Sequence, residues 1–289
     1  MNILITGSTG TVGKAFVLNL QKSKKNYLCL LVRDVEKAKN FFGNKSNIEY
    51  ISVLEISRIR EKSFDMVFHL AAYITSNDDE ESMAKLIETN IGFASQLLFN
   101  LQYCNGIKLF VNFGTFAEYR FGTSEINNAY LYSATKSAFK EILKYYADKT
   151  GYSYINIIPY TIYGGKDSSK KVIDYLKESL NSIESVQMTN GEQVLDFIHL
   201  DDVVDFLCYL IPNVNKVISK KYKEYFLGTG KGTSIRELAS MLEKKYKQKC
   251  NVDWGARSYR PRDVMHAVAP IGHLLDIGWK PKILLENSI

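Results

Sequence analysis

Tyr132 and Lys136 lie four residues apart in a segment, 131–148, whose apolar residues recur at helical spacing. Two side chains at this spacing lie on the same face of a helix. A tyrosine phenol has a pKa of about 10 and is a poor acid or base at neutral pH, but a lysine ammonium one turn away favours the phenolate and lowers that pKa. The pair therefore suggests general acid–base catalysis. Because a Tyr-x-x-x-Lys spacing often occurs by coincidence, this interpretation depends on the elements around it.

The segment ITGSTGTVGK at 5–14 contains three glycines between a short apolar run and a helical pattern. A second apolar run completes a β–α–β unit of about thirty residues, which is the context that a dinucleotide-binding glycine loop requires. In such a loop Gly7 permits the tight turn, Gly10 lets the backbone approach a pyrophosphate and Gly13 allows close packing of helix and strand. The first amides of the helix would bind the anion. A purely structural glycine-rich turn is disfavoured by the flanking strand and helix.

Strand and helix patterns alternate over the first half of the chain. Buried strands are expected at 2–6, 27–33, 64–70, 107–114 and 152–160, and helices at 83–101 and 131–148. Thr115 follows one of these strands and would lie beside the helix that carries Tyr132. The alternation predicts an α/β fold with a Rossmann-like, doubly wound parallel sheet, in which ligands bind beyond the carboxyl ends of the strands.

The pattern becomes less regular from about residue 165, with short helices expected at 201–211 and 234–246. We therefore expect a dinucleotide-binding domain at 1–164, to which about 194–230 also contributes. A smaller α/β substrate-binding lobe would be formed mainly by 165–289.

The chain has 289 residues, of which 46% are hydrophobic, and a net charge of +6. Its densest basic stretches, 216–225 and 243–249, contain acids or follow a helical pattern, which favours a solvated surface over a nucleic-acid site. We find neither a run of about 18 apolar residues that would predict a membrane span nor a signal-peptide pattern. The cysteines are scattered and the histidines lack ligand spacing, so we expect a cytoplasmic protein without disulfides or a metal site. His69 is expected to pack and to form hydrogen bonds.

The sequence resembles the extended short-chain dehydrogenase/reductase family, which includes NAD-dependent epimerases and dehydratases, over essentially its full length. The motifs that carry this resemblance are TGxxGxxG at 6–13, HLAA at 69–72, Asn90, GT at 114–115, Tyr132-x-x-x-Lys136, PYTIYGG at 159–165, LDFIHLDDV at 195–203 and the segment 260–282. Within the family, the segments GTFAEY, LYSATKSAFKEILKYY and WGARSYRPRDVM are most similar to C-4 ketoreductases for nucleotide-linked deoxysugars, the CDP-abequose and CDP-paratose synthase type.

The resemblance implies roles for individual residues. Thr115, Tyr132 and Lys136 would be catalytic, and Thr115 would also contact the substrate. Arg260 would bind the phosphates of a nucleotide-sugar substrate, a role that suits a planar guanidinium. The cofactor would be bound by Gly7, Thr9, Gly10, Thr11 and Val12 at its pyrophosphate, by Leu70, Ala71 and Ala72 at its adenosine, and by Pro159, Ile162, Tyr132 and Lys136 at its nicotinamide end.

Some positions depart from the family's pattern. Leu195 replaces an arginine that contacts the nucleotide, and Ser52 stands where an aspartate often contacts adenine. The family's 4,6-dehydratases have Asp and Glu directly after the catalytic threonine, whereas this chain has Phe116 and Ala117, and Glu118 comes one residue late. These positions argue against a dehydratase.

The residues after the second predicted strand bear on the choice of cofactor. Sites that select NAD place Asp or Glu there to accept hydrogen bonds from the ribose 2′-hydroxyl. Here Arg33 would instead meet a 2′-phosphate, which predicts NADP(H). Asp34 follows directly, and a shift of one residue would reverse this argument.

We therefore expect an NADPH-dependent reductase of the C-4 ketone of a nucleotide-linked 4-keto-deoxysugar, acting in deoxysugar or surface-polysaccharide biosynthesis. A nucleotide-sugar 4-epimerase would use the same catalytic residues and stays open as an alternative. A catalytically inert NADP-binding regulator is the alternative of another class, which the presence of Tyr132 and Lys136 disfavours.

A homodimer is also expected. Relatives in the family commonly pair the helices that match 83–101 and 131–148 into a four-helix bundle. Both segments are rich in apolar residues, and those expected to be available for the interface are Phe93, Leu97, Phe139 and Tyr146.

Overall fold

The computed structural model describes residues 1–23, 25–166, 170–218 and 221–289. Its main sheet has seven strands in the order β10-β6-β5-β4-β1-β2-β3, and all their pairings are parallel. The strands are β1 Asn2–Thr6, β2 Tyr27–Val32, β3 Ile48–Ser52, β4 Met66–His69, β5 Leu109–Phe113, β6 Ser153–Pro159 and β10 Tyr222–Leu227. The predicted doubly wound parallel sheet is confirmed, and the strand order reverses next to β1, where such sheets bind ligands.

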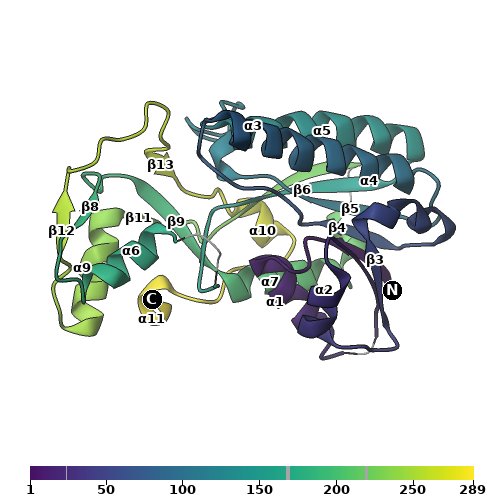
Figure 1. The fold of residues 1–289 in the computed structure, drawn as a ribbon, viewed down its shortest axis with the longest axis horizontal. Coiled ribbons are helices and arrows are strands. Elements are labelled where there is room, and N and C mark those ends of the chain that lie inside the picture. Colours follow the sequence, from purple (N-terminus) through teal and green to yellow (C-terminus); the bar gives the residue numbers. More distant parts are fainter. Residues whose placement is uncertain (24, 167–169, 219–220) are drawn as a thin grey trace.

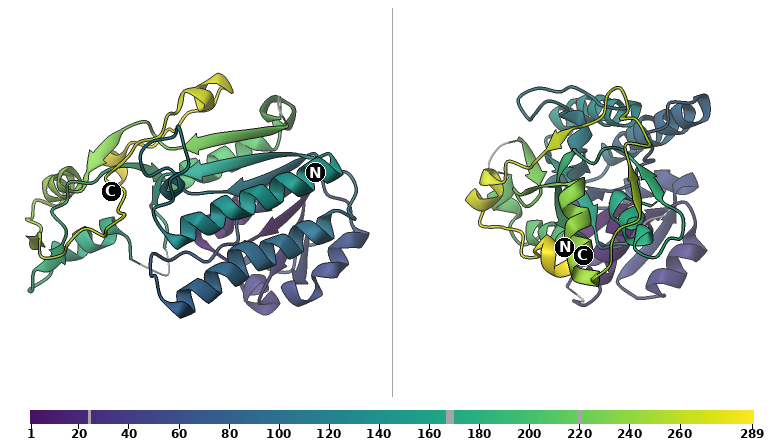
Figure 2. Two further views of the ribbon diagram at one scale, coloured as in Figure 1. Left: turned by 90° about the horizontal axis from the view of Figure 1, so that it is seen from above. Right: turned by 90° about the vertical axis from the view of Figure 1, so that its left-hand side faces the viewer.

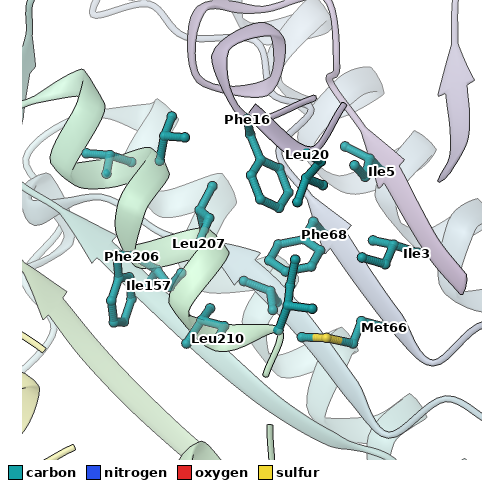
Figure 3. Packing of buried hydrophobic residues seen from close by; sticks show 14 of the residues in the cluster. Ile3, Ile5, Phe16, Leu20, Met66, Phe68, Ile157, Phe206, Leu207 and Leu210 are labelled. Atoms are coloured by element: carbon teal, nitrogen blue, oxygen red, sulfur yellow. The ribbon is translucent and has the colours of Figure 1, made fainter. Parts of the chain in front are cut away.

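Helices cover both faces of this sheet (Figure 1). One face carries α1 Thr11–Leu20, α2 Val35–Phe42 and α7 Leu200–Leu210; the other carries α3 Glu80–Leu86, α4 Ala94–Leu101 and α5 Leu131–Thr150. Alternate strand residues enter the two cores, as Ile3 and Ile5 pack with Phe16 of α1 while Leu4 joins the α4–α5 side. Figure 3 shows the first of these cores, where Phe68 of β4 lies between side chains of α1 and α7. Because both faces are covered, the strands are almost continuously apolar.

The predicted helix 83–101 consists of three parts. A π-helical turn, Ile87–Phe93, separates α3 from α4. Such turns are rare and often occur at functional sites. Leu97 and Phe139, which were expected at a dimer interface, are fully buried in the chain's own core. That part of the interface prediction is therefore wrong, because both side chains fill the space between the helices and the sheet.

The predicted helix at 131–148 is confirmed as α5, but only part of its apolar spacing faces the sheet. Ile142 packs against the core on that side, whereas Ala138 and Tyr145 are exposed. The buried face contains Phe139 and Leu143 together with polar residues, among them Lys136. A helix that buries polar side chains such as Lys136 cannot be oriented correctly by its hydrophobic pattern alone.

The C-terminal lobe contains two small sheets and its own core (Figure 1, left). In the larger one, β9 Val194–His199 pairs with β7 Thr161–Tyr163, β11 Gly232–Ser234 and β13 His266–Ala267. The other pairs β8 Val186–Met188 with β12 Val252–Trp254, and the lobe's helices are α6 Val172–Ser179, α9 Ile235–Tyr246 and α11 Leu285–Ser288.

The chain passes between the two parts several times. After β9 it returns to the main sheet with α7 and β10, and after α9 it returns again with α10 Gly272–Asp276 and Trp279, which pack in the first core. The remaining elements are the 3₁₀ helices η1 Val53–Glu61 and η3 Phe116–Glu118 and the short helix α8 Val214–Val217.

Two features are absent from the described parts of the chain. None of their helices is long and apolar enough to cross a membrane. Within the same ranges, no group of three or more His, Cys, Asp or Glu side chains could hold a metal ion.

Candidate active site

The glycine loop between β1 and α1 is packed too tightly for side chains. Gly7 has φ +70°, and a Cβ there would lie 2.5 Å from the amide nitrogen of Ala71. A Cβ at Gly13 would lie 2.2 Å from the carbonyl oxygen of Gly7, whereas one at Gly10 would make only a 3.4 Å contact. No side chain caps the N-terminus of α1. The loop therefore leaves the first amides of α1 available to an anion, as a dinucleotide pyrophosphate requires.

The other residues predicted to bind the cofactor follow the carboxyl ends of neighbouring strands. Thr9, Thr11 and Val12 are half-buried around the glycine loop, and the Thr11 hydroxyl donates a hydrogen bond to the carbonyl oxygen of Lys166 (3.2 Å). Leu70, Ala71 and Ala72 follow β4, Arg33 follows β2, Pro159 ends β6 and Ile162 lies in β7. The parallel sheet thus brings this predicted set to one edge.

His69 at the end of β4 packs in the core and forms a hydrogen bond, as expected. Its Nδ1 shares a 2.8 Å hydrogen bond with the Thr6 hydroxyl, and its ring packs among Phe93, Phe110 and Phe139. Burial and the nearby Lys136 charge lower the pKa of His69 to about 3. The ring is therefore neutral at physiological pH.

Asn90 connects the segment after β4 to α5. From the π-helical turn, its Oδ1 accepts a hydrogen bond from the amide of Tyr73 (2.8 Å), and its Nδ2 donates to the Tyr73 carbonyl (3.0 Å) and to the Thr135 hydroxyl (3.1 Å). Thr135 lies between Tyr132 and Lys136 on α5. The sequence marked Asn90 only as part of a family motif; a polar side chain inside an apolar helix was the further signal.

Tyr132 and Lys136 lie one turn apart on α5, beside the turn that carries Thr115. Thr115 and Lys136 are buried, at 8% and 2% exposure, and Tyr132 is half-buried. Burial lowers the pKa of the Lys136 ammonium to about 8, although Glu118 opposes this. Burial and the Glu118 charge raise the pKa of Tyr132.

Lys136 is expected to lower the pKa of Tyr132, since its charge favours the phenolate. The net shift in this structure is nevertheless upward, because burial removes the phenolate from water and the Glu118 charge repels it. The phenol is therefore protonated at neutral pH, which is the form that donates a proton.

Thr115 is held by a reciprocal pair of hydrogen bonds at the start of η3. Its Oγ1 accepts from the Ala117 amide (3.3 Å), and its own amide donates to Glu118 Oε1 (2.8 Å). Because Oγ1 acts here as an acceptor, its proton remains available for another partner. Sequence reasoning noted Glu118 only as misplaced for a dehydratase and missed this contact.

The loop that carries Arg260 contacts the start of α5. The Arg260 guanidinium lies 5.8 Å from the centre of the Tyr130 ring, and the Tyr130 hydroxyl donates to Asp263 Oδ1 (2.7 Å). Arg120 donates to the carbonyl oxygens of Pro261 and Asp263. The exposed Arg260 therefore lies close to the start of α5.

The departures from the family's pattern are accommodated by the structure. Leu195 is half-buried in β9 and packs in the apolar clusters on either side of that strand. Ser52 caps η1 by accepting a hydrogen bond from the Leu54 amide. Asp196, which follows Leu195 in the LDFIH motif, is fully buried and accepts hydrogen bonds from the amides of Thr229, Gly230 and Ala269.

A cavity of about 660 Å³ lies away from these residues. It is bounded by β11, α9 and the segment 280–286, and its lining contains none of the predicted site residues. The predicted site is instead the sheet edge between the glycine loop and α5.

Comparison with known proteins supports this description. CDP-abequose synthase of Salmonella typhimurium is 29% identical over 99% of this chain and 95% of its own length, and CDP-abequose synthase of Yersinia pseudotuberculosis is 25% identical over 92% and 91%. UDP-glucuronic acid 4-epimerase from Bacillus cereus, solved with NAD and a UDP sugar, has a similar fold, with a TM-score of 0.85 and 18% identity over 100% of this chain and 96% of that one. The sequence model of the NAD dependent epimerase/dehydratase family matches residues 3–228. The chain therefore belongs to the NAD dependent epimerase/dehydratase family.

Proposed function

We propose that this protein uses NADPH to reduce the C-4 ketone of a nucleotide-linked 4-keto-deoxysugar, as a step in deoxysugar or surface-polysaccharide biosynthesis. The observation that carries the proposal is the placement of Tyr132, Lys136 and Thr115 together, at the sheet edge that also holds the glycine loop. The CDP-abequose synthases, which align with nearly the whole chain, support a nucleotide-sugar substrate.

The catalytic residues have complementary tasks in this proposal. A bound nicotinamide would supply the hydride. Tyr132 donates its phenolic proton to the C-4 oxygen, while the free proton of the Thr115 hydroxyl forms a hydrogen bond to the same oxygen. Lys136 would contact the ribose of a bound nicotinamide nucleotide, and its positive charge favours the phenolate that remains after proton transfer. Arg260 binds the substrate's phosphates.

The proposal is tested by incubating the purified protein and NADPH with a panel of 4-keto-6-deoxy nucleotide sugars and following NADPH absorbance. We expect oxidation of NADPH with one of them and a product reduced at C-4. If no member of the panel oxidises NADPH above the rate without protein, the reductase proposal is wrong.

A 4-epimerase is the second candidate, favoured by the fold similarity to 4-epimerases. An epimerase would interconvert C-4 epimers of a nucleotide sugar with bound NAD(P) and without net consumption of the cofactor. Product analysis after incubation with a nucleotide hexose separates the two reactions. An inert regulator would bind NADPH and give neither product.

A preference for NADPH over NADH is the first prediction. In the structure Asp34 is the N-cap of α2, and its Oδ1 accepts a hydrogen bond from the Lys37 amide (2.9 Å). Arg33 is exposed at the end of β2. We therefore expect Arg33 to contact a 2′-phosphate, and Arg33→Ala to reduce the preference for NADPH by about 10- to 100-fold, as for a lost charged hydrogen bond.

The ratio of kcat/KM for the two cofactors measures this preference. Lys22→Ala, which removes an exposed cation elsewhere on the same face, is the control and should leave the ratio unchanged. An Arg33→Ala protein with the wild-type ratio would show that the 2′-phosphate is not bound there.

We also propose a homodimer formed by the outer faces of α3, α4 and α5, which lie side by side (Figure 2). Met83 of α3, Ile87 of the π-helical turn and Tyr145 of α5 are 43%, 42% and 60% exposed. We expect light scattering to give twice the chain's 33.0 kDa and Ile87→Glu to shift the protein toward monomer. Ile183→Glu, at a fully exposed position of the C-terminal lobe, is the control. A monomeric wild-type protein at micromolar concentration would contradict the proposal.

A further inference from the structure

Glu118 is a fully buried carboxylate beside the catalytic residues. Its Oε1 accepts a hydrogen bond from the amide of Thr115 (2.8 Å), and its Oε2 accepts one from the hydroxyl of Ser137 (3.0 Å). Ser137 directly follows Lys136 on α5. One carboxylate therefore joins the turn that carries the threonine to the helix that carries the tyrosine and the lysine.

The surrounding backbone provides space for this carboxylate. A Cβ at Gly114 would lie 2.5 Å from Glu118 Oε1 and 2.5 Å from a methyl of Ile158. A residue larger than glycine at this position would displace the carboxylate. Gly114 of the GT motif therefore leaves the space that the Glu118 carboxylate occupies.

Two lysines of α5, Lys136 and Lys140, carry the positive charges that act on Glu118. Lys140 donates to Glu224 Oε1 of β10 (2.9 Å) and so has a carboxylate partner of its own. Tyr119, the titratable group next to Glu118 in the chain, donates to the other oxygen of Glu224 (2.6 Å). Among the acidic residues of the described ranges, Glu118 is the one whose charge acts on Lys136, and it also acts on Tyr132.

We propose that Glu118 is a positioning residue of this active site, which fixes the Thr115 turn against α5 and places a negative charge beside Lys136 and Tyr132. The inference rests on the proposed function, because it assigns Lys136 to cofactor binding and Tyr132 to proton donation. It adds a residue that lies outside the predicted catalytic and binding set.

The effect on pH dependence has one sign for both groups. An ionised carboxylate stabilises the neighbouring ammonium and destabilises the neighbouring phenolate, so it raises the pKa of Lys136 and that of Tyr132. The positive charges of Lys136 and Lys140 favour ionisation of Glu118, against the burial that raises its pKa. Removal of the negative charge therefore makes both groups lose their protons at lower pH.

The test compares Glu118→Gln with the wild-type protein. Glutamine keeps an oxygen for the Thr115 amide but has no charge. We expect the basic limbs of kcat and of NADPH affinity to move to lower pH by about one unit, the low end of the shift caused by a neighbouring charge. Glu141→Gln, which neutralises an exposed carboxylate on the same helix, is the control and should leave both limbs in place.

NADPH affinity, measured by cofactor fluorescence between neutral and alkaline pH, separates this inference from the reductase proposal. If no keto sugar is reduced but the affinity limb still moves in Glu118→Gln, the proposed reaction fails and the role of Glu118 stands. If the basic limbs of Glu118→Gln coincide with those of the wild type or move to higher pH, Glu118 does not raise the pKa values of Lys136 and Tyr132, and the inference is wrong.

Discussion

Replacing Tyr132 by phenylalanine is expected to reduce turnover by about 10²–10⁴-fold, the usual contribution of a positioned general acid. This factor corresponds to roughly 3–5 kcal/mol of activation free energy. The hydroxyl is the only group removed, and no hydrogen bond of this hydroxyl to the protein is seen in the described structure. Folding and NADPH affinity should therefore be preserved while the proton source is lost.

The measurement is single-turnover oxidation of bound NADPH by a 4-keto nucleotide sugar, followed by absorbance. Tyr145→Phe removes an exposed hydroxyl from the same helix and should retain the wild-type rate. Thr115→Val should lose less activity than Tyr132→Phe, because it removes a hydrogen-bond donor and not the transferred proton. Near wild-type turnover in Tyr132→Phe would show that another group is the acid.

Gly13→Ala is expected to damage the fold and the cofactor site together. Its Cβ would lie 2.2 Å from the Gly7 carbonyl oxygen and 2.8 Å from the Cα of Ser8, both parts of the backbone of the glycine loop. Neither atom can move without separating α1 from β1. Overpacking of this kind costs about 1–3 kcal/mol and sometimes more, so the melting temperature should fall by several degrees and NADPH binding should be lost.

Gly10→Ala separates the two effects. A Cβ there would contact only the Gly7 carbonyl oxygen, at an ordinary 3.4 Å, so the protein should keep its melting temperature. It should still lose affinity for NADPH, because the methyl group would stand where the pyrophosphate approaches the loop. Gly272→Ala in α10, whose Cβ would contact nothing within 4 Å, is the control for both measurements. A Gly13→Ala protein as stable as this control would contradict the packing argument.

The sequence predicted the parts of the fold that depend on local pattern. Continuous apolar runs located β1 and β2, and the glycine spacing between them located the loop that precedes α1. Such runs can be recognised because a strand of a parallel sheet is covered on both faces. Parallel pairing then places the ends of these strands at one edge, whereas the assignment of Leu70 and Pro159 to the cofactor came from the resemblance to the family.

The features that the sequence did not reveal depend on three-dimensional packing. Apolar spacing along 131–148 identified a helix but not the face that carries Lys136, because that face buries polar side chains. The π-helical turn at Ile87–Phe93 has no local signal, and its effect is seen only in the contacts of Asn90. Glu118 was judged by its distance from Thr115 along the chain, whereas its role depends on Ser137 of a later helix.

The repeated passage of the chain between the sheet and the C-terminal lobe has a consequence for how the molecule comes apart. The lobe is formed by several separate segments, and the returning elements α7, β10 and α10 complete the core of the main sheet. Asp196 joins one of the lobe's strands to the chain on either side of these returns. Neither part is a contiguous block of sequence, so neither could be lost by truncation or transplanted by recombination alone. We therefore expect the two parts to melt as one cooperative unit.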